Sequence, residues 1–437
     1  MRADRRAPRE LEITGFSHDG RGVAREQGKT VFVAGALLGE RVIAQLYKRG
    51  RRFDEASVVE VLSPSPDRVA PGCEHFGVCA GCAMQHLRFE QQIAAKQQVL
   101  ADNLSRLGQV EPLRWLEPLQ GPPWGYRRRA RLSVRDVPKK GRVLVGFREA
   151  NGRYVADIQS CPVLDPRISQ LLPHLSALAG ELSVRDQIPQ IEVSAGDEGI
   201  ALVIRHLAPL SEADRAALAA FAEAHQVTLY GQIKGPETIT CVAGPDSPMR
   251  YGLPDYSVDY EFLPSDFIQV NAAMNRMMVA AAVNALALKP EDRVLDLFCG
   301  LGNFSLPIAR SGARVCGVEG APELVARARH NAERQGLAVE FAVADLSADH
   351  RDVNWAQDHW NKLLLDPPRA GAAEVLKYLP GSRVERVVYV SCHPGSLARD
   401  AGVLVREHGF ALSAAGVMDM FPHTAHVESL AIFDRMR

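Results

Sequence analysis

Hydrophobic and polar residues follow a regular alternation in the last third of the chain. Short apolar runs, typical of buried strands, are separated by segments with the three- and four-residue spacing of amphipathic helices. The strand-like runs are VLDLF (294–298), ARVCGVE (313–319), VEFAVAD (339–345), KLLLD (362–366) and RVVYVSC (386–392). The helical patterns include ELVARARHNAERQ (323–335) and SLARDAGVLVREH (396–408). This alternation predicts an α/β domain with a doubly wound, Rossmann-like parallel sheet and helices on both faces.

The first part of the chain has a different pattern. Short β-type runs at 30–33, 41–47 and 57–62, separated by glycine-containing turns, predict a small OB-like β-barrel. Two segments rich in proline and glycine, 63–72 and 244–255, are expected to be boundary loops. We therefore expect three domains: a barrel over 1–62, a central α+β domain over 63–255, and the doubly wound domain over 256–437.

The middle region contains a strand with two different faces. Arg127, Arg129, Arg131 and Arg135 alternate with apolar residues, so one face of the strand is basic. The net charge of the whole chain is only -1. Its distribution is uneven, because basic residues far outnumber acidic ones between Tyr126 and Arg153. Such a cluster is suited to RNA, and a solvated basic surface is the alternative interpretation.

Composition narrows the class of protein. Of the 437 residues, 46% are hydrophobic and 24% charged, which is typical of a globular protein and excludes wholesale disorder. No apolar run approaches the roughly 18 residues of a membrane span, and the first residues, MRADRRAPRE, lack the apolar core of a secretory signal. We expect a cytoplasmic monomer without a membrane partner. Its eight cysteines are then ligands, catalysts or core residues rather than disulfides.

The turn after the first predicted strand carries a cofactor motif. It reads DLFCGLGNF from Asp296, a D-x-x-x-G-x-G pattern, with Ser305 where a dinucleotide-binding fingerprint has its third glycine. This favours S-adenosylmethionine over a dinucleotide. Glu319 and Asp345 end the next two strands, where carboxylates are placed to meet the ribose hydroxyls and the adenine edge.

The fourth and fifth strands end in residues suited to methylation of a pyrimidine carbon. DPPR (366–369) resembles the D-P-P-aromatic motif of amino-group methyltransferases, but Arg369 replaces the aromatic residue. Cys392 ends the fifth strand. Carbon 5 of uracil becomes nucleophilic only after a thiolate adds to carbon 6, and a base must later remove the carbon-5 proton. The alternative for such a cysteine is a buried structural residue.

Five motifs resemble, in order, those of the RNA uracil-C5 methyltransferases: FIQVN (267–271), DLFCGLGNFSLP (296–307), DPPRAG (366–371), VSCHP (390–394) and HVES (426–429). The resemblance implies Cys392 as nucleophile and Glu428 as base. It implies cofactor contacts from Gln269, Phe298, Asn303, Glu319, Asp345 and Asp366. One departure is His393, where the family usually has asparagine. His393, His423 and His426 compete with Glu428 for the role of base, and a strand over AHVESLAIF would place His426 and Glu428 on one face.

A cluster of cysteines precedes the basic region. Cys73, Cys79 and Cys82 form C-x5-C-x2-C, and Cys161 is the best fourth ligand. Spacing alone fits zinc, with His75 or His86 as further candidates, as well as it fits iron–sulfur. A subset of the family is similar in carrying a [4Fe-4S] cluster on such a loop. We therefore expect a [4Fe-4S] cluster that fixes a loop facing RNA.

The N-terminal region narrows the expected substrate. Residues 1–62 resemble a TRAM domain, and a barrel together with a cluster is similar to the branch of the family that methylates 23S rRNA. The expected partner is therefore 23S rRNA. Methylation of another rRNA or tRNA uridine, an amino-group RNA methyltransferase, and a non-catalytic iron–sulfur or zinc RNA-binding protein remain alternatives. Cys392 and Glu428 argue against the non-catalytic protein, and Arg369 argues against amino-group chemistry.

Overall fold

The computed structural model describes residues 7–150, 152–379 and 384–436, so the first six residues of the charged N-terminal segment lie outside it. Within these ranges the chain folds into two compact units. The first comprises the described residues within Met1–Val99, Phe147–Ala156 and Phe421–His426, and the second those within Leu100–Gly146, Asp157–Met420 and Val427–Arg437. The two short segments in the first unit are far in sequence from its main part, and no local pattern predicts their place.

The first unit contains a six-stranded sheet with the order β1-β5-β6-β4-β3-β2. The strands are β1 (Arg9–Glu12), β2 (Gly15–Phe16), β3 (Gly22–Glu26), β4 (Lys29–Ala34), β5 (Arg41–Arg49) and β6 (Phe53–Ser63). The predicted strands at 30–33, 41–47 and 57–62 are confirmed as β4, β5 and β6. Alternate residues such as Val31, Val33 and Val42 form its apolar core. Helix α1 (Phe89–Asn103) begins in this unit.

The second unit contains two larger sheets, of which the first has the order β13-β12-β11-β10-β8-β9. Its strands are β8 (Arg129–Val137), β9 (Arg142–Gly146), β10 (Gln190–Ala195), β11 (Ile200–Arg205), β12 (Thr228–Gln232) and β13 (Thr240–Ala243). Helices α2 (Pro166–Glu181) and α3 (Glu212–His225) accompany it. Ala130, Leu132 and Val134 are buried, which confirms the apolar face predicted for β8.

The prediction of a boundary loop over 244–255 is wrong in part. Residues Met249–Leu253 form strand β14, which pairs antiparallel with β15 (Val258–Phe262). The pairing sets Tyr251 opposite Tyr260, and both rings are buried. This burial favours a hairpin in a segment whose proline and glycine content indicates a loop.

The last sheet of the second unit has the order β18-β17-β16-β19-β20-β22-β21-β7. Its strands are β7 (Arg114–Trp115), β16 (Arg293–Leu297), β17 (Arg314–Glu319), β18 (Val339–Val343), β19 (Lys362–Leu365), β20 (Arg386–Ser391), β21 (Phe410–Met418) and β22 (Glu428–Arg435). Strands β16 to β20 are parallel, whereas β22 runs antiparallel to β20 and to β21. Each strand predicted from 294 to 392 is confirmed.

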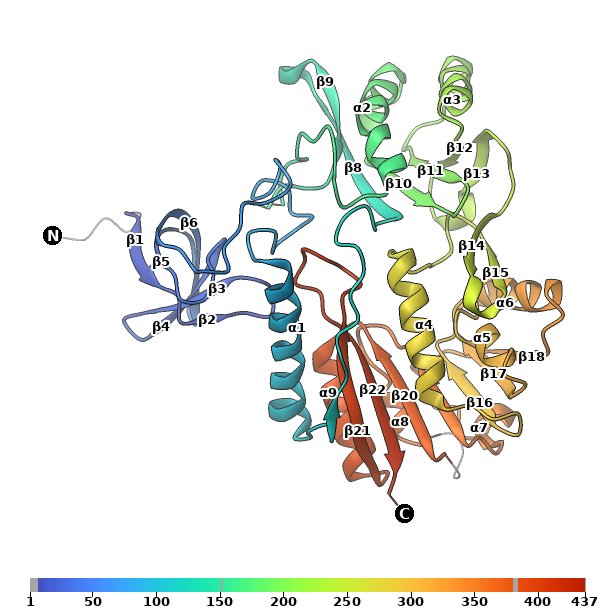
Figure 1. The fold of residues 1–437 in the computed structure, drawn as a ribbon. Helices are drawn as coiled ribbons and strands as arrows, with labels where there is room; N and C mark the ends of the chain where they lie inside the picture. The colour runs from blue at the N-terminus through green and yellow to red at the C-terminus, as the bar shows by residue number, and fades with distance from the viewer. Residues whose placement is uncertain (1–6, 151, 380–383, 437) are drawn as a thin grey trace. The chain divides into compact units, whose positions relative to one another are not determined.

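Helices cover both faces of this sheet (Figure 1). They include α4 (Ala272–Leu286), α5 (Ser305–Ala309), α6 (Pro322–Arg334), α7 (Asn354–Gln357), α8 (Ala373–Leu376) and α9 (Pro394–Arg406). The predicted helices at 323–335 and 396–408 are confirmed as α6 and α9. Among the described helices, none has the length and apolar character needed to cross a membrane.

Candidate active site

The loop between β16 and α5 has the backbone of a ligand-binding turn. Phe298 adopts φ +66°, a value rare for a residue with a side chain, and Gly302 adopts φ +81°. This left-handed φ favours glycine at position 302, and a Cβ added there would also lie 2.6 Å from Leu306 Cδ1. Tyr260 fixes the conformation of this turn, because its buried hydroxyl donates to the carbonyls of Gly302 (3.1 Å) and Asn303 (3.2 Å).

Asp296 carries an unsatisfied carboxylate oxygen at the base of this loop. The residue is fully buried, and its Oδ2 accepts a hydrogen bond from Ser305 Oγ at 2.5 Å. Its Oδ1 has no hydrogen-bond partner. Burial, and then the charge of Glu319, raise the pKa of Asp296 to about 7. A buried acceptor without a donor is costly, so this site is suited to a ligand that brings a donor or a cation.

Glu319 ends β17, as predicted, whereas β18 ends at Val343, two residues before Asp345. Glu319 accepts hydrogen bonds from the backbone N–H groups of Gly300 (3.2 Å) and Gly320 (2.7 Å), which fixes its carboxylate beside the glycine loop. Asp345 is exposed, and its Oδ1 accepts from the Ser347 hydroxyl at 2.6 Å. That hydrogen bond lowers the pKa of Asp345.

Asn303 and Gln269 are tied to neighbouring elements. The Asn303 amide exchanges two hydrogen bonds with Asn275 of α4, at 3.1 and 2.9 Å, and its oxygen also accepts from Tyr251. The backbone carbonyl of Gln269 accepts from Arg128 Nε at 2.9 Å. The contacts of the Asn303 side chain fix the loop against α4.

Asp366 follows β19 and belongs to the same edge. Loss of solvent, and then the charge of Asp296, raise the pKa of Asp366 to about 7. Two carboxyl groups thus repel one another at the carboxyl ends of β16 and β19. Because a cation between them would relieve this repulsion, the pair is suited to a positively charged ligand.

Asp400 of α9 holds the loop after Asp366 and was not singled out from the sequence. It is fully buried and accepts hydrogen bonds from the Ala372 N–H and the Tyr389 hydroxyl, both at 2.7 Å. Arg399 Nε donates to its other oxygen at 2.8 Å. The available signal is its position among Leu397, Ala401 and Leu404, where a carboxylate interrupts the apolar face of a helix.

Cys392 and Glu428 meet across two antiparallel strands. In the β20–β22 pair, Ser391 is opposite Ser429, and the register continued by one residue sets Cys392 opposite Glu428. Loss of solvent, and then the charges of Glu428 and Asp366, raise the pKa of the Cys392 thiol to about 11. Arg369 opposes this shift. The structure therefore brings the predicted nucleophile and base together, with the thiol protonated at neutral pH.

His393 caps the N-terminus of α9, a role for which asparagine is also suited. It is the N-cap of α9, and its Nδ1 accepts a hydrogen bond from the Ser396 N–H at 3.1 Å. Asparagine is among the preferred N-cap residues because its side-chain oxygen accepts the same kind of bond. The departure from the family motif therefore preserves the cap.

The other two histidines belong to the segment 421–426 of the first unit. His423 Nδ1 lies 3.3 Å from Gln92 Nε2, and burial lowers the pKa of His423 to about 4. His426 precedes β22, which begins only at Glu428, so the expected strand over AHVESLAIF starts three residues late. The prediction of a strand over AHVESLAIF is therefore wrong for its first three residues, and strand periodicity does not place His426 relative to Glu428.

The cysteine loop belongs to the first unit and Cys161 to the second. Cys79 Sγ accepts a hydrogen bond from the Gly81 N–H at 3.3 Å, and the Cys79 N–H donates to the His75 carbonyl. Cys161 is buried, and its N–H donates to Ser169 Oγ at 2.9 Å. Across residues 7–150, 152–379 and 384–436, no group of three or more potential ligands has the arrangement of a metal site.

The basic face of β8 is less open than the sequence predicts. Arg131 is exposed, but the Arg129 side chain is only 20% exposed and donates to the carbonyls of Pro264 and Asp266. Burial lowers the pKa of Arg129. Arg129 thus anchors the segment before FIQVN and is not available to a polyanion.

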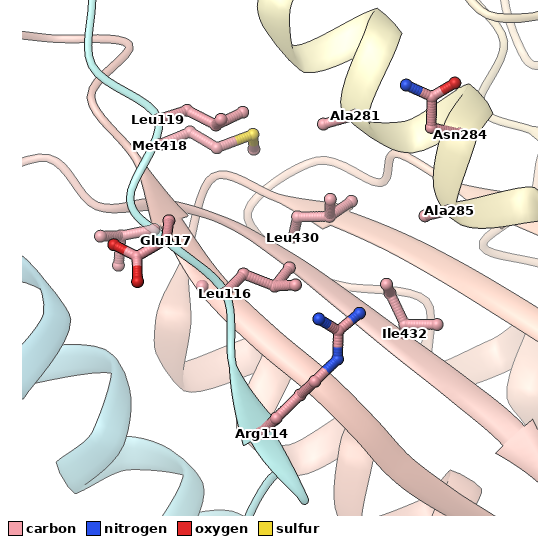
Figure 2. A pocket seen from close by; sticks show the side chains of 12 residues that line it. Arg114, Leu116, Glu117, Leu119, Ala281, Asn284, Ala285, Met418, Leu430 and Ile432 are labelled. Atoms are coloured by element: carbon pink, nitrogen blue, oxygen red, sulfur yellow. The ribbon is translucent and has the colours of Figure 1, made fainter.

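A cavity of about 320 Å³ has none of the predicted site residues in its lining. Figure 2 shows Leu430 and Ile432 of the sheet opposite Ala281 and Ala285 of α4, with Leu116 at one side. The lining is mainly apolar and contains neither Cys392 nor Glu428.

The strand order of the last sheet and the carboxylates at its edge define a protein of the class I methyltransferase fold. The family model of the tRNA (uracil-5-)-methyltransferases matches residues 88–436. The 23S rRNA (uracil(1939)-C(5))-methyltransferase RlmD of Xanthomonas campestris pv. campestris (strain 8004) is 55% identical over 434 residues, 98% of each chain. That of Stenotrophomonas maltophilia (strain K279a) has the same identity and coverage. The chain belongs to the tRNA (uracil-5-)-methyltransferase family.

One solved structure supports the fold over nearly the whole chain. Pyrococcus abyssi tRNA (uracil-54, C5)-methyltransferase, in complex with S-adenosyl-L-homocysteine, is similar with a TM-score of 0.74 and 24% identity. The match covers 97% of this chain and 100% of that one.

Proposed function

We propose that this chain methylates carbon 5 of uridine 1939 in 23S rRNA, with S-adenosylmethionine as methyl donor. The observation that carries the chemistry is the position of Cys392 opposite Glu428 at the carboxyl edge of the sheet. The relatives that are 55% identical over 98% of the chain carry this activity in their names, which supports the choice of nucleotide.

The two facing side chains divide the chemistry between them. The Cys392 thiol gives its proton to solvent water, and Sγ then bonds to carbon 6 of the uracil, which moves the electron pair of the C5–C6 double bond towards carbon 5. S-adenosylmethionine supplies the methyl group that carbon 5 takes. Glu428 then accepts the proton from carbon 5, the electron pair of that C–H bond restores the ring double bond, and the bond between Sγ and carbon 6 breaks.

The cofactor is assigned to the edge formed by β16 to β19. Asp296 Oδ1 is buried without a donor, and the carboxyl groups of Asp296 and Asp366 both have a pKa near 7, so the residues fit a cationic ligand. The proposed contacts are Gln269, Phe298, Asn303, Glu319, Asp345 and Asp366. Gln269 and Asp366 are also assigned to the target uracil.

A [4Fe-4S] cluster is proposed on Cys73, Cys79, Cys82 and Cys161. The fit rests on the donor set, since four thiols suit such a cluster, and on the hydrogen bond from the Gly81 N–H to Cys79 Sγ, a contact typical of cluster ligands. No step of the methyl transfer is redox, so the cysteines would fix the loop for RNA binding. The sheet of the first unit is assigned as a TRAM domain, and the protein as a cytoplasmic monomer.

The target is tested by mapping 5-methyluridine in 23S rRNA from cells that lack the gene. Position 1939 should be unmethylated, and wild-type protein but not Cys392→Ala should restore the modification. An unchanged level of 5-methyluridine at position 1939 in the deletion strain would refute the assignment.

The nucleophile is tested with RNA that carries 5-fluorouridine at the target position. Fluorine cannot leave as a proton, so the adduct should survive denaturation. Cys392→Ala should abolish it. Cys299→Ala is the matched control, because Cys299 is buried in the glycine loop and should leave the adduct intact. An adduct that persists in Cys392→Ala would assign the nucleophile to another residue.

A further inference from the structure

A second cavity in the same unit contains none of the proposed catalytic residues. It encloses about 530 Å³ beside the first turn of α4. The residues that give it its chemical character are Trp124, Arg128, Asp165, Arg167, Asp197 and Arg276. Because Cys392, Glu428 and Asp366 are not among its lining residues, it is a different site from the one described above.

Arg128 is the unusual member of this lining. Its side chain is buried, and the whole residue is only 4% exposed. Nε donates to the Gln269 carbonyl at 2.9 Å, and the guanidinium lies 4.7 Å from the centre of the Tyr251 ring. Nη2 has no hydrogen-bond partner. Since a buried charged donor without an acceptor is strongly unfavourable, the cavity is built for an acceptor that comes from outside the chain.

The remaining charges of the cavity are paired. Arg167 Nη2 contacts Asp165 Oδ2 at 2.8 Å, and Arg276 Nη2 lies 3.5 Å from Asp197 Oδ2. Arg128 therefore lies outside both of these ion pairs. Ala272 and Ala273, from the first turn of α4, also line the cavity, and the first N–H groups of a helix favour an anion. The site matches a ligand with one negative charge and several acceptor oxygens.

We propose that this cavity binds one phosphodiester of the substrate RNA through Arg128. This inference rests on the proposed function. A phosphodiester carries a single negative charge, and the 37% exposed Trp124 offers a ring on which a neighbouring base stacks. Arg128 also holds the segment of Gln269, because its N–H donates to the Val270 carbonyl at 2.8 Å. Binding of the phosphate thus positions the FIQVN segment.

The test replaces single phosphates of a 23S rRNA fragment with neutral methylphosphonates. For wild-type protein, one linkage should weaken binding roughly tenfold, the size expected for a charge-assisted hydrogen bond. In Arg128→Gln the same replacement should have no effect, while the other linkages behave as in the wild type. If every linkage gives the same change in both proteins, the proposal is wrong.

Arg276→Gln at the exposed rim provides a second test that does not alter the buried guanidinium. It leaves Asp197 without its ion partner, so it should weaken RNA binding several-fold and leave the affinity for S-adenosylmethionine unchanged. Arg276 Nε donates to the Gly252 carbonyl at 3.2 Å. Arg310→Gln is the control, because this exposed arginine likewise donates to a backbone carbonyl, that of Ser257, but lies outside the cavity. Equal RNA affinity of Arg276→Gln and Arg310→Gln would contradict the assignment.

Binding of inorganic phosphate tests whether the ligand of the cavity is RNA or a free anion. If phosphate binds wild-type protein but not Arg128→Gln, and no single RNA linkage depends on Arg128, the cavity serves a free anion and the proposal is overturned. Methylation of the unmodified fragment by wild-type protein is measured first. Its absence would contradict the proposed function instead, so the two failures are distinguishable.

Discussion

The negative charge of Glu428 disfavours ionisation of the neighbouring Cys392 thiol. The charge of Glu428 contributes to the thiol pKa of about 11, so few Cys392 side chains are thiolates at neutral pH. In the proposed mechanism, the same proximity places Glu428 to remove the carbon-5 proton later. His423 is held by Gln92, and His426 precedes β22, whereas Glu428 begins that strand.

Glu428→Gln should therefore stall the reaction after methylation. In the proposed mechanism, attack by Cys392 and methyl transfer precede loss of the carbon-5 proton, so ordinary RNA should accumulate as a methylated adduct on Cys392. Denaturing gels and mass spectrometry of the adduct give the readout. His426→Ala is the control and should turn over. Accumulation of the adduct in His426→Ala, with normal turnover in Glu428→Gln, would transfer the role of base to the histidine.

Substitution of His393 should separate capping from catalysis. His393→Asn retains an acceptor for the Ser396 N–H and should keep both stability and activity. His393→Ala removes the cap of α9 and should lower the free energy of unfolding by about 1 kcal/mol. Chemical denaturation measures both variants. Loss of the adduct in His393→Asn would show that the imidazole itself takes part in the chemistry.

The paired carboxyl groups make cofactor affinity depend on pH. Because the pKa values of Asp296 and Asp366 are raised to about 7, both groups become protonated as the pH falls below 7. A cationic ligand binds the ionised forms, so affinity for S-adenosylmethionine should fall between pH 8 and pH 6. Asp366→Asn should flatten this dependence. Calorimetry that finds constant affinity for the wild type over this range would refute the electrostatic argument.

At the scale of elements, the ionised carboxyl groups of Asp296 and Asp366 lower the free energy of unfolding above pH 7. A carboxyl whose pKa is raised in the folded state stabilises the fold only when protonated, so this contribution is lost as the pH rises from about 4 through 7. Asp400 and Tyr260 act in the opposite sense, since their hydrogen bonds fix the two loops that carry these groups. The edge of the sheet is thus held in place by its neighbours.

The arginines of strand β8 should have two different roles: Arg131 and Arg135 should contribute to RNA binding, and Arg129 to stability. Arg131→Glu and Arg135→Glu change exposed side chains, so each should weaken RNA binding and reduce the slope of log affinity against log salt by about 0.7 to 0.9. Arg129→Glu should instead destabilise the fold by about 3–5 kcal/mol, because it places a carboxylate beside the carbonyls of Pro264 and Asp266. Binding titrations and thermal melts distinguish these effects. If Arg129→Glu melts at the same temperature as the wild type, Arg129 belongs instead to the RNA-binding surface.

At the scale of the whole molecule, the proposed ligands of the [4Fe-4S] cluster are Cys73, Cys79, Cys82 and Cys161. Protein purified without oxygen should be brown and contain about four irons and four sulfides per chain. Cys161→Ser should bleach it, whereas Cys241→Ser, at a cysteine outside the predicted set, should not. Stoichiometric zinc without sulfide would refute the iron–sulfur assignment.

The sequence by itself determined the parallel sheet and most of its edge. Strand and helix periods predict β16 to β20, and parallel strands bring their carboxyl ends to one edge, so the places of Asp296, Glu319, Asp366 and Cys392 follow from local patterns. The choice of S-adenosylmethionine and of uracil chemistry came from the motifs at that edge.

Only the tertiary structure decided which distant residues meet. The antiparallel pairing of β20 with β22 sets Glu428 opposite Cys392 and leaves His426 outside the strand. Burial of Arg129 and of Arg128 depends on the segment 264–271, which follows them by more than 130 residues. Such contacts are set by packing between elements, and the period of a single strand or helix contains no information about the element that will cover it.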